Sequence, residues 1–293
     1  MWFIFAFLNS WIYAIYYLCN QNSKLTPQQF IIYRGFIAAF AATPFMLLYP
    51  SVFPLMFYII VLFQGIIISY MDRKYFEAFR RFGAENVNAI RPLTVAITFI
   101  SWLLIDPTVF FAYLETPYRT SIISLSIMVI IISVIKYRGH AVGLSCFQKV
   151  FPLLLLSSLV DMSNKLIMDY TNGHLYIAAI YRVGLTGWII GFINLFTNCK
   201  NKTDYIQIFK LKNLVKGLFI LWLVLSMVIL NLAMFYTSHP AYCSAVFYLS
   251  VVWIVLINKI NNLRGKVGPY QSLDKKWIFS LLFATIILVL ITG

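Results

Sequence analysis

Two arginines lie inside apolar stretches of this sequence, and each directly follows a tyrosine. Tyr33 and Arg34 stand in FIIYRGFIAAFAATPFMLLY, and Tyr181 and Arg182 stand in LYIAAIYRVGLTGWIIGFINLF. A charge near the centre of a bilayer costs about 2.5 kcal/mol or more, so it is rarely kept without a function. A guanidinium group that faces an aqueous cavity can bind a carboxylate or a phosphate, best as a bidentate pair. The pattern predicts that these two Tyr–Arg pairs bind or gate an anionic substrate.

Arg91, beside Pro92 in another apolar stretch, is the third arginine that we expect at a cavity. One alternative applies to all three arginines. Each lies within about two turns of an expected helix end, where its side chain can snorkel to the headgroups and bind nothing. Arg34 and Arg182 are expected to enter from opposite sides of the membrane, which makes them candidate gates at the two ends of one pathway. Arg91 has no basic counterpart in the second half and is the more substrate-specific candidate.

An acidic and basic triplet marks a later apolar stretch. Asp161, Lys165 and Asp169 follow one another at intervals of four residues, so they share one helical face. A carboxylate in a dry site beside a lysine is a candidate for proton or ion coupling, and Asp161 is the deeper of the two acids. The favoured alternative is an internal salt bridge within the triplet that neutralises both the carboxylate and the lysine.

A second charged cluster, Asp72, Arg73, Lys74 and Glu77, ends the third apolar stretch. The segment DRKYFEAFRRF contains no Gly or Pro, so the helix is expected to continue through Phe82. The cluster either lines the mouth of a cavity or, as we favour, forms a solvated extension of the helix.

No metal site or cofactor is expected. The cysteines do not have zinc-ligand spacing, and the histidines form no HExxH motif or cluster. The histidines are His140, His174 and His239, which we expect in loops or at helix ends.

The composition predicts an all-α, polytopic membrane protein. Hydrophobic residues make up 61% of the 293 residues and charged residues 11%, whereas a soluble domain carries about 25% charge. About ten stretches are long enough to be transmembrane helices. They cover about 2–19, 28–48, 54–72, 86–105, 120–136, 150–168, 175–196, 214–236, 240–258 and 277–292.

The net charge of +14 does not require a nucleic-acid partner. Most lysines and arginines fall in short loops beside apolar stretches, as the positive-inside rule explains. The same rule places both termini outside the cytoplasm. The partners expected from the sequence are the lipid bilayer and a small-molecule metabolite.

The two Tyr–Arg pairs also suggest an internal repeat. Each follows one apolar stretch and precedes three more, so residues 1–138 and 148–293 are expected to be five-helix repeats within a single integral membrane domain. AENVNAIRPLTVAITFISWLLI and PAYCSAVFYLSVVWIVLI are similar at matching places. Because the number of helices per repeat is odd, the second repeat must be inverted relative to the first, as is typical of transporters.

The chain resembles the ten-helix drug/metabolite transporter superfamily, of the EamA-like kind. The stretches that carry the resemblance are PQQFIIYRGFIAAFAATPF, YFEAFRRFGAENVNAIRPLTVAITFISWLLI, LETPYRTSIISLSIMVIIISVI with Glu115 at the acidic place, and FPLLLLSSLVDMSNKLIMDY followed by IYRVGLTG. The resemblance implies a secondary carrier in the cytoplasmic (inner) membrane with inverted halves around a central cavity. The family usually has an aliphatic residue at the place of Arg91, and it commonly has both termini in the cytoplasm.

The leading hypothesis is therefore a secondary transporter, not an enzyme, that exports or exchanges a small anionic or zwitterionic metabolite by alternating access. One alternative is an integral membrane transferase with a lipid-linked donor. Such an enzyme needs acid/base groups on a surface loop, and the available acids are Glu77, Glu85, Asp106 and Glu115. A non-transporting membrane subunit is the third reading, and a homodimer is compatible with all three.

Overall fold

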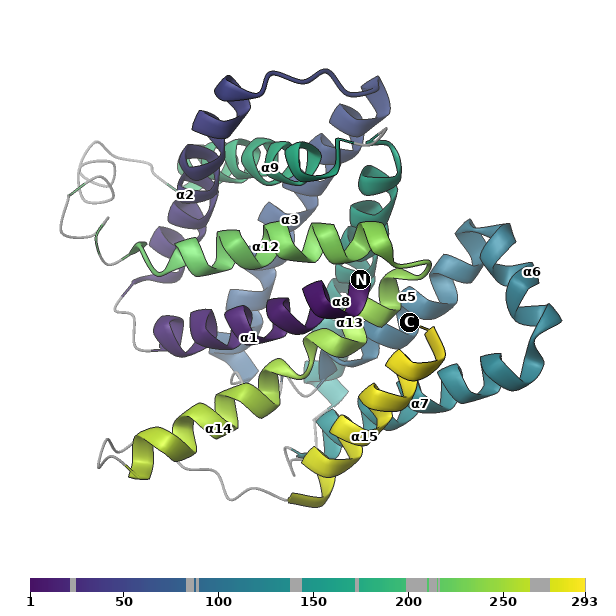
Figure 1. Cartoon of the computed structure of the whole chain (residues 1–293). Coiled ribbons are helices and arrows are strands. Elements are labelled where there is room, and N and C mark those ends of the chain that lie inside the picture. The colour runs from purple at the N-terminus through teal and green to yellow at the C-terminus, as the bar shows by residue number, and fades with distance from the viewer. Residues whose placement is uncertain are drawn as a thin grey trace.

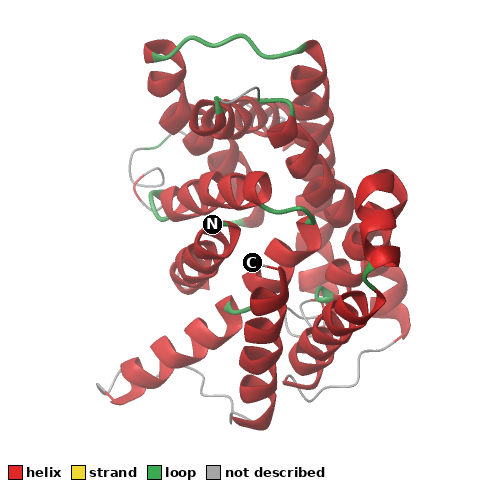
Figure 2. Cartoon of the chain, turned by 45° about the vertical axis from the view of Figure 1, so that its right-hand side comes forward, coloured by secondary structure: helices red, strands yellow, loops and turns green. Residues whose placement is uncertain are grey.

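The computed structural model describes residues 1–21, 25–82, 87, 90–137, 144–171, 174–198, 210, 215, 217–263 and 275–292. Every regular element in these ranges is a helix, as Figure 1 and Figure 2 show. The helices are α1 (Trp2–Gln21), α2 (Pro27–Leu48), α3 (Leu55–Phe82), α5 (Leu93–Ile105), α6 (Pro107–Glu115), α7 (Pro117–Tyr137), α8 (Leu144–Asp169), α9 (Leu175–Asn198), α12 (Ile220–Tyr236), α13 (Pro240–Phe247), α14 (Ser250–Leu263) and α15 (Lys275–Thr292).

Three helices begin in the same way, with a capping side chain followed by proline. Thr26 accepts a hydrogen bond from the Gln29 amide before α2, and the Gln29 side chain accepts one from the Thr26 amide. Asp106 caps α6 and His239 caps α13. Proline is favoured at the first helical position because its missing N–H would have no partner there. These sequences fix where each helix starts.

Helices α2 and α9 cross at a contact made of glycines. A Cβ atom added to Gly35 would lie 2.2 Å from the backbone nitrogen of Gly191 and 2.9 Å from the carbonyl oxygen of Gly187. Small residues let two helices approach this closely where no hydrophobic force drives their association. Further along α2, Met46 lies against Gly184. Contacts that advance along α2 therefore retreat along α9, and the two helices run antiparallel.

The remaining helices pack around this crossing. Helix α1 packs on α12 and α3 packs on α8, while α5 and α13 pack on α8 and α1 respectively. Helices α7 and α15 lie side by side at one edge of the molecule (Figure 1). There the Arg119 guanidinium donates hydrogen bonds of 3.1 and 2.7 Å to the Ile291 carbonyl, near the end of α15. Elements far apart in the sequence thus form most of the core.

Several described helices are long and apolar enough to cross a membrane. Four qualify singly, and a fifth span results if α5 and α6, which are bent by 101° at Asp106, are taken together. The four are Gln28–Leu48, Leu55–Tyr75, Leu144–Asp169 and Leu175–Thr197. These helices indicate a membrane protein. The exposed apolar side chains fit the same conclusion, because Leu47, Leu104 and Leu290 are 77%, 80% and 78% exposed.

Some predicted boundaries change. The expected continuation of the third stretch is confirmed, because α3 extends through Phe82. Helix α6 was not expected; the Asp106 cap and the following proline start a new helix where the sequence suggested a link. The expected span 240–258 divides into α13 and α14, and Tyr248 lies at the break.

Some of the loop charges behind the predicted orientation are not placed. Basic residues of four of the connections lie outside the described residues: Lys24, Arg138, Lys200, Lys202, Lys212, Lys216, Arg264 and Lys266. The expected junction between the two repeats, 139–147, lies outside the described residues up to 143, and its last four residues begin α8. The side of each terminus stays a prediction.

Candidate binding cavity

A cavity of about 450 Å³ lies between helices from both halves of the chain. Its lining comes from α1, α2, α3, α8, α9, α12, α13, Tyr248 and the residues around the start of α5. Five of its lining residues carry ionisable acidic or basic side chains: Arg34, Arg91, Arg182, Asp72 and Asp161. The three arginines singled out from the sequence thus line one cavity. This differs from the expectation that Arg34 and Arg182 stand at separate ends of a pathway.

Arg34 has a carboxylate partner within its own half. Its guanidinium donates to the Asp72 carboxylate, which joins α2 to α3. Both side chains are largely buried, with 15% and 12% exposed. Asp72 is thus part of the cavity wall, so the favoured solvated reading is wrong for this residue. It holds for Lys74 and Glu77, which form an exposed pair at 2.7 Å.

Arg182 has an amide partner instead. Its Nε donates to the Gln64 side-chain oxygen at 2.9 Å, and Arg182 is only 2% exposed. The Gln64 nitrogen in turn donates to the Asn164 oxygen at 2.9 Å and to the Ser163 hydroxyl at 2.7 Å. Arginine can only donate, so it fixes the orientation of the Gln64 amide. Asn164 then has its donor nitrogen free of this chain of bonds, in a residue that lines the cavity.

No ion pair of Arg182 occurs among the described residues. The two terminal nitrogens of its guanidinium group can therefore bind an external anion.

Arg91 lies in the turn just before α5, where its carbonyl accepts a hydrogen bond from the Thr94 amide. Aromatic side chains surround its guanidinium group. Tyr13 of α1 and Tyr248 line the cavity together with Arg91, and the Arg91 Cζ atom lies 5.4 Å from the centre of the Tyr75 ring. A guanidinium over an aromatic face gains electrostatic energy from the ring quadrupole. Arg91 therefore faces the cavity within an aromatic cage and does not snorkel to a helix end.

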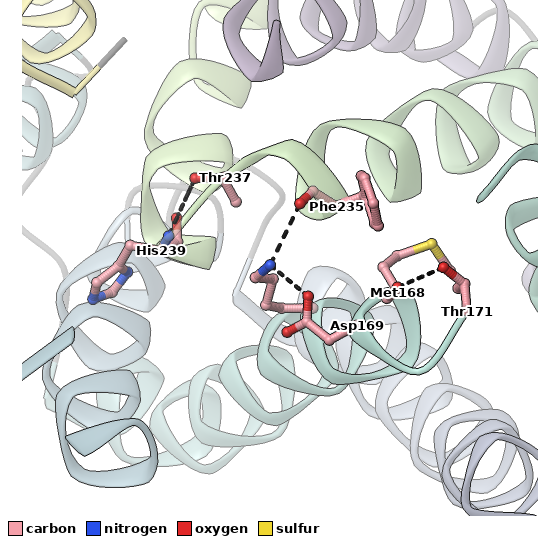
Figure 3. Close-up of polar contacts among 7 residues, drawn as sticks. Met168, Asp169, Thr171, Phe235, Thr237 and His239 are labelled. Carbon is pink, nitrogen blue, oxygen red and sulfur yellow. Dashed lines mark hydrogen bonds and ion pairs between the residues drawn. The ribbon is translucent and has the colours of Figure 1, made fainter. Parts of the chain in front are cut away.

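The favoured internal salt bridge of Lys165 forms, but its partner is not Asp161. Lys165 instead binds Asp169 at 2.6 Å and the Phe235 carbonyl at 3.4 Å, and Figure 3 shows these two partners on facing helices. The carbonyl groups at the C-terminal end of α12 attract the ammonium group. Asp161 accepts a hydrogen bond of 2.7 Å from Ser244 of α13 and lines the cavity. Lys165 does not line it.

The tyrosines of the two Tyr–Arg pairs do not line the cavity. Adjacent helical residues point about 100° apart, so an arginine that faces inward directs its neighbour elsewhere. The Tyr181 hydroxyl donates toward the carbonyls of Met46 and Tyr49, at 3.0 and 3.2 Å, and accepts from the Ser51 amide at 2.9 Å. Tyr33, which is 1% exposed, packs against Gly217. Tyr181 thus binds the segment that precedes α3, a helix of the other half, whereas Tyr33 lies against Gly217, shortly before α12.

One histidine is structural. His239 is fully buried, and its Nδ1 accepts from the Ala241 amide at 3.2 Å, so its Nε2 donates to the Phe99 carbonyl at 3.1 Å. Its backbone amide is bonded to Thr237 (Figure 3). No group of three His, Cys, Asp or Glu side chains within the described ranges could hold a metal ion.

Comparison of the chain with models of known protein families finds no match, and comparison with curated proteins finds none either. The assignment of function therefore depends on the chain's own residues.

Sequence reasoning missed Gln64 and Asn164. Both are uncharged residues within apolar stretches, and neither belongs to a motif. A buried amide in a predicted transmembrane helix is itself a signal, because such a group must find a hydrogen-bond partner. Which partner it finds depends on three helices that meet only in the folded chain.

Proposed function

We propose that the protein is a secondary transporter that moves a small anionic or zwitterionic metabolite across the membrane by alternating access. The cavity carries this proposal, because it holds Arg91 and Arg182 without a carboxylate partner and Asp161 without a cation partner among the described ion pairs. Unpaired charges in a membrane-embedded cavity mark substrate or ion pathways. A zwitterionic substrate can pair with both the arginines and Asp161, whereas an anionic substrate can pair with the arginines alone.

The proposal includes ten spans in two inverted five-helix repeats. Five shorter apolar helical segments accompany the four long helices and the bent pair, which together supply ten candidate segments. Each Tyr–Arg arginine is the eighth residue of its helix, counted from Pro27 in α2 and from Leu175 in α9. These two helices run antiparallel, as inverted repeats require.

The lining of the cavity supports the same repeat. The cavity residues of α8 are Ser157, Val160, Asp161 and Asn164, and those of α1, Asn9, Tyr13 and Tyr16, lack only a counterpart of Val160. Those of α3 and α12 share a spacing of three, one and three: Ile68, Met71, Asp72 and Tyr75, and Leu223, Ser226, Met227 and Leu230. Paired helices that present matching faces to one cavity are what two related halves would produce.

Membership of the drug/metabolite transporter superfamily and a place in the cytoplasmic membrane belong to this proposal. The residues quoted for the resemblance support them. A homodimer stays a prediction.

The transferase reading has no support from a specific contact. Asp106 caps α6, and Glu77 is paired with Lys74. Glu115 ends α6, and Glu85 lies outside the described residues.

Uptake into proteoliposomes tests the transport proposal. The purified full chain is expected to give saturable uptake of a carboxylated or phosphorylated metabolite from a mixed pool. The triple variant Arg34→Gln, Arg91→Gln, Arg182→Gln is expected to lose most of that uptake, since the loss of a charge-assisted contact from Arg91 or Arg182 costs about tenfold each. Equal uptake by the triple variant would refute the role of the arginines.

A further inference from the structure

The two Tyr–Arg arginines differ in one cavity position on the described helix that follows their own, which is α3 after α2 and α12 after α9. When the cavity faces of α3 and α12 are superposed by their common spacing, Asp72 of α3 corresponds to Met227 of α12. Asp72 is the carboxylate that neutralises Arg34. The corresponding place on α12, in the same cavity as Arg182, therefore holds a thioether, which carries no charge.

This difference leaves the second arginine incomplete. Gln64 binds only the Nε of Arg182 and contributes no charge. Asp161 lines the same cavity but is hydrogen-bonded to Ser244 and forms no ion pair with Arg182 among the described residues. A largely buried guanidinium without a directly bound carboxylate favours the arrival of an external anion. The cavity gives such an anion room, since both Arg182 and Met227 line it.

We propose that Arg182 is the anion subsite of the transporter, and that the oxyanion group of the substrate takes the place which Asp72 takes at Arg34. The ligand chemistry is a carboxylate or phosphate group. This inference rests on the proposed transport function and assigns different roles to its arginines. Arg182 binds the substrate, whereas Arg34 is bound to its own carboxylate and holds α2 to α3.

The polar surroundings of Arg182 suit an oxyanion. Asn164 has a donor nitrogen that the Gln64 contact leaves available, and it lines the cavity. Asn9 is fully buried, its oxygen accepts from Ser226, and its side-chain nitrogen has no partner in the part of the chain that the structure describes. Both amides thus offer donors, which match the acceptor oxygens of an anion. Oxyanions with hydrogen bonds to both charged and neutral donors are bound more tightly than by charge alone.

The test introduces a carboxylate by mutation that can compete with an external anion for Arg182. Titration calorimetry of the detergent-purified full chain with inorganic phosphate, and separately with acetate, measures the subsite directly. The wild-type protein is expected to bind at least one of the two anions saturably. Met227→Asp places a carboxylate at the position equivalent to Asp72 and is expected to weaken binding about tenfold or more. The matched variant Met227→Asn, of nearly the same shape but without charge, is expected to stay within about twofold.

A second variant guards against misfolding of Met227→Asp. Gln64→Glu brings a carboxylate to Arg182 from α3 and is expected to weaken binding to a similar degree. Undiminished anion binding in both acidic variants would overturn the proposal, and so would the absence of saturable binding of either anion to the wild-type protein. Preference for phosphate or for acetate shows whether the subsite favours a phosphate or a carboxylate group.

Failure of this inference can be told apart from failure of the proposed function. Uptake that persists in proteoliposomes while both acidic variants bind anions normally refutes only the assignment of Arg182. Anion binding that follows the predicted pattern in a chain that transports nothing supports the subsite and refutes transport.

Discussion

The first half of the chain satisfies its buried arginine with a carboxylate, whereas the second half satisfies the corresponding arginine with an amide. Arg34 is bound to Asp72 of its own half. Arg182 is bound to Gln64, which belongs to the other half and is itself fixed by Asn164. Both arginines occupy the eighth position of their helix and line the same cavity.

The difference teaches that equal position does not imply equal role. A repeat determines where a side chain points, because helix geometry determines direction. The partner that it meets depends on single residues of neighbouring helices. Asp72 makes Arg34 an internal contact, and the uncharged Met227 leaves Arg182 able to serve a ligand.

The contact between the halves is the most sensitive place to test this comparison. Gly35→Ala is expected to destabilise the protein by about 3 kcal/mol or more, because the added methyl group meets the backbone of α9 and neither helix can yield cheaply. Thermal unfolding in detergent and the yield of monodisperse protein measure the effect. Gly217→Ala is the matched control, since its Cβ would lie 3.0 Å from the edge of the Tyr33 ring, a side chain that can shift. Equal stability of the two variants would contradict the tight crossing.

Neutralising each arginine separately sharpens the comparison of the two halves. Arg34→Gln strands the largely buried Asp72 carboxylate and is expected to cost about 2 kcal/mol, whereas Arg182→Gln strands only the neutral Gln64 oxygen and is expected to cost about 1 kcal/mol. Chemical or thermal unfolding of the two variants measures both losses of stability and shows which is larger.

Adding Asp72→Asn to Arg34→Gln is expected to recover part of the loss, because no charge is then left unpaired. A larger loss for Arg182→Gln than for Arg34→Gln would reverse the assigned roles.

The smallest expected effect concerns the tyrosine beside Arg182. Tyr181→Phe removes the hydroxyl that joins α9 to the Met46, Tyr49 and Ser51 backbone, at a cost of about 1 kcal/mol. Anion affinity should not change, since Tyr181 lies outside the cavity lining. Tyr118→Phe is the control, because Tyr118 is 80% exposed. A loss of anion binding in Tyr181→Phe, but not in Tyr118→Phe, would show that Tyr181 takes part in anion binding.

Much of the local structure followed from the sequence. The absence of Gly and Pro after Asp72 predicted the long α3, and the apolar stretches predicted helices where α1, α2 and α9 are found. Helix α6 was missed because its cap, Asp106, is a single residue in a segment that also suits a link. Among the site residues, Arg34, Arg91, Arg182 and Asp161 were predicted and do line one cavity.

The sequence by itself determined that this is a helical membrane protein with costly charges in its apolar stretches, because hydropathy and helix-breaking residues act locally. Only the tertiary structure decided how those charges are paired. Asp161 and Asp169 are both four residues from Lys165, and spacing alone cannot choose between them. Lys165 pairs with Asp169 because the end of α12 brings the Phe235 carbonyl to the same ammonium group. In the same way, the partner of each arginine is set by a helix that packs beside it, which no local pattern contains.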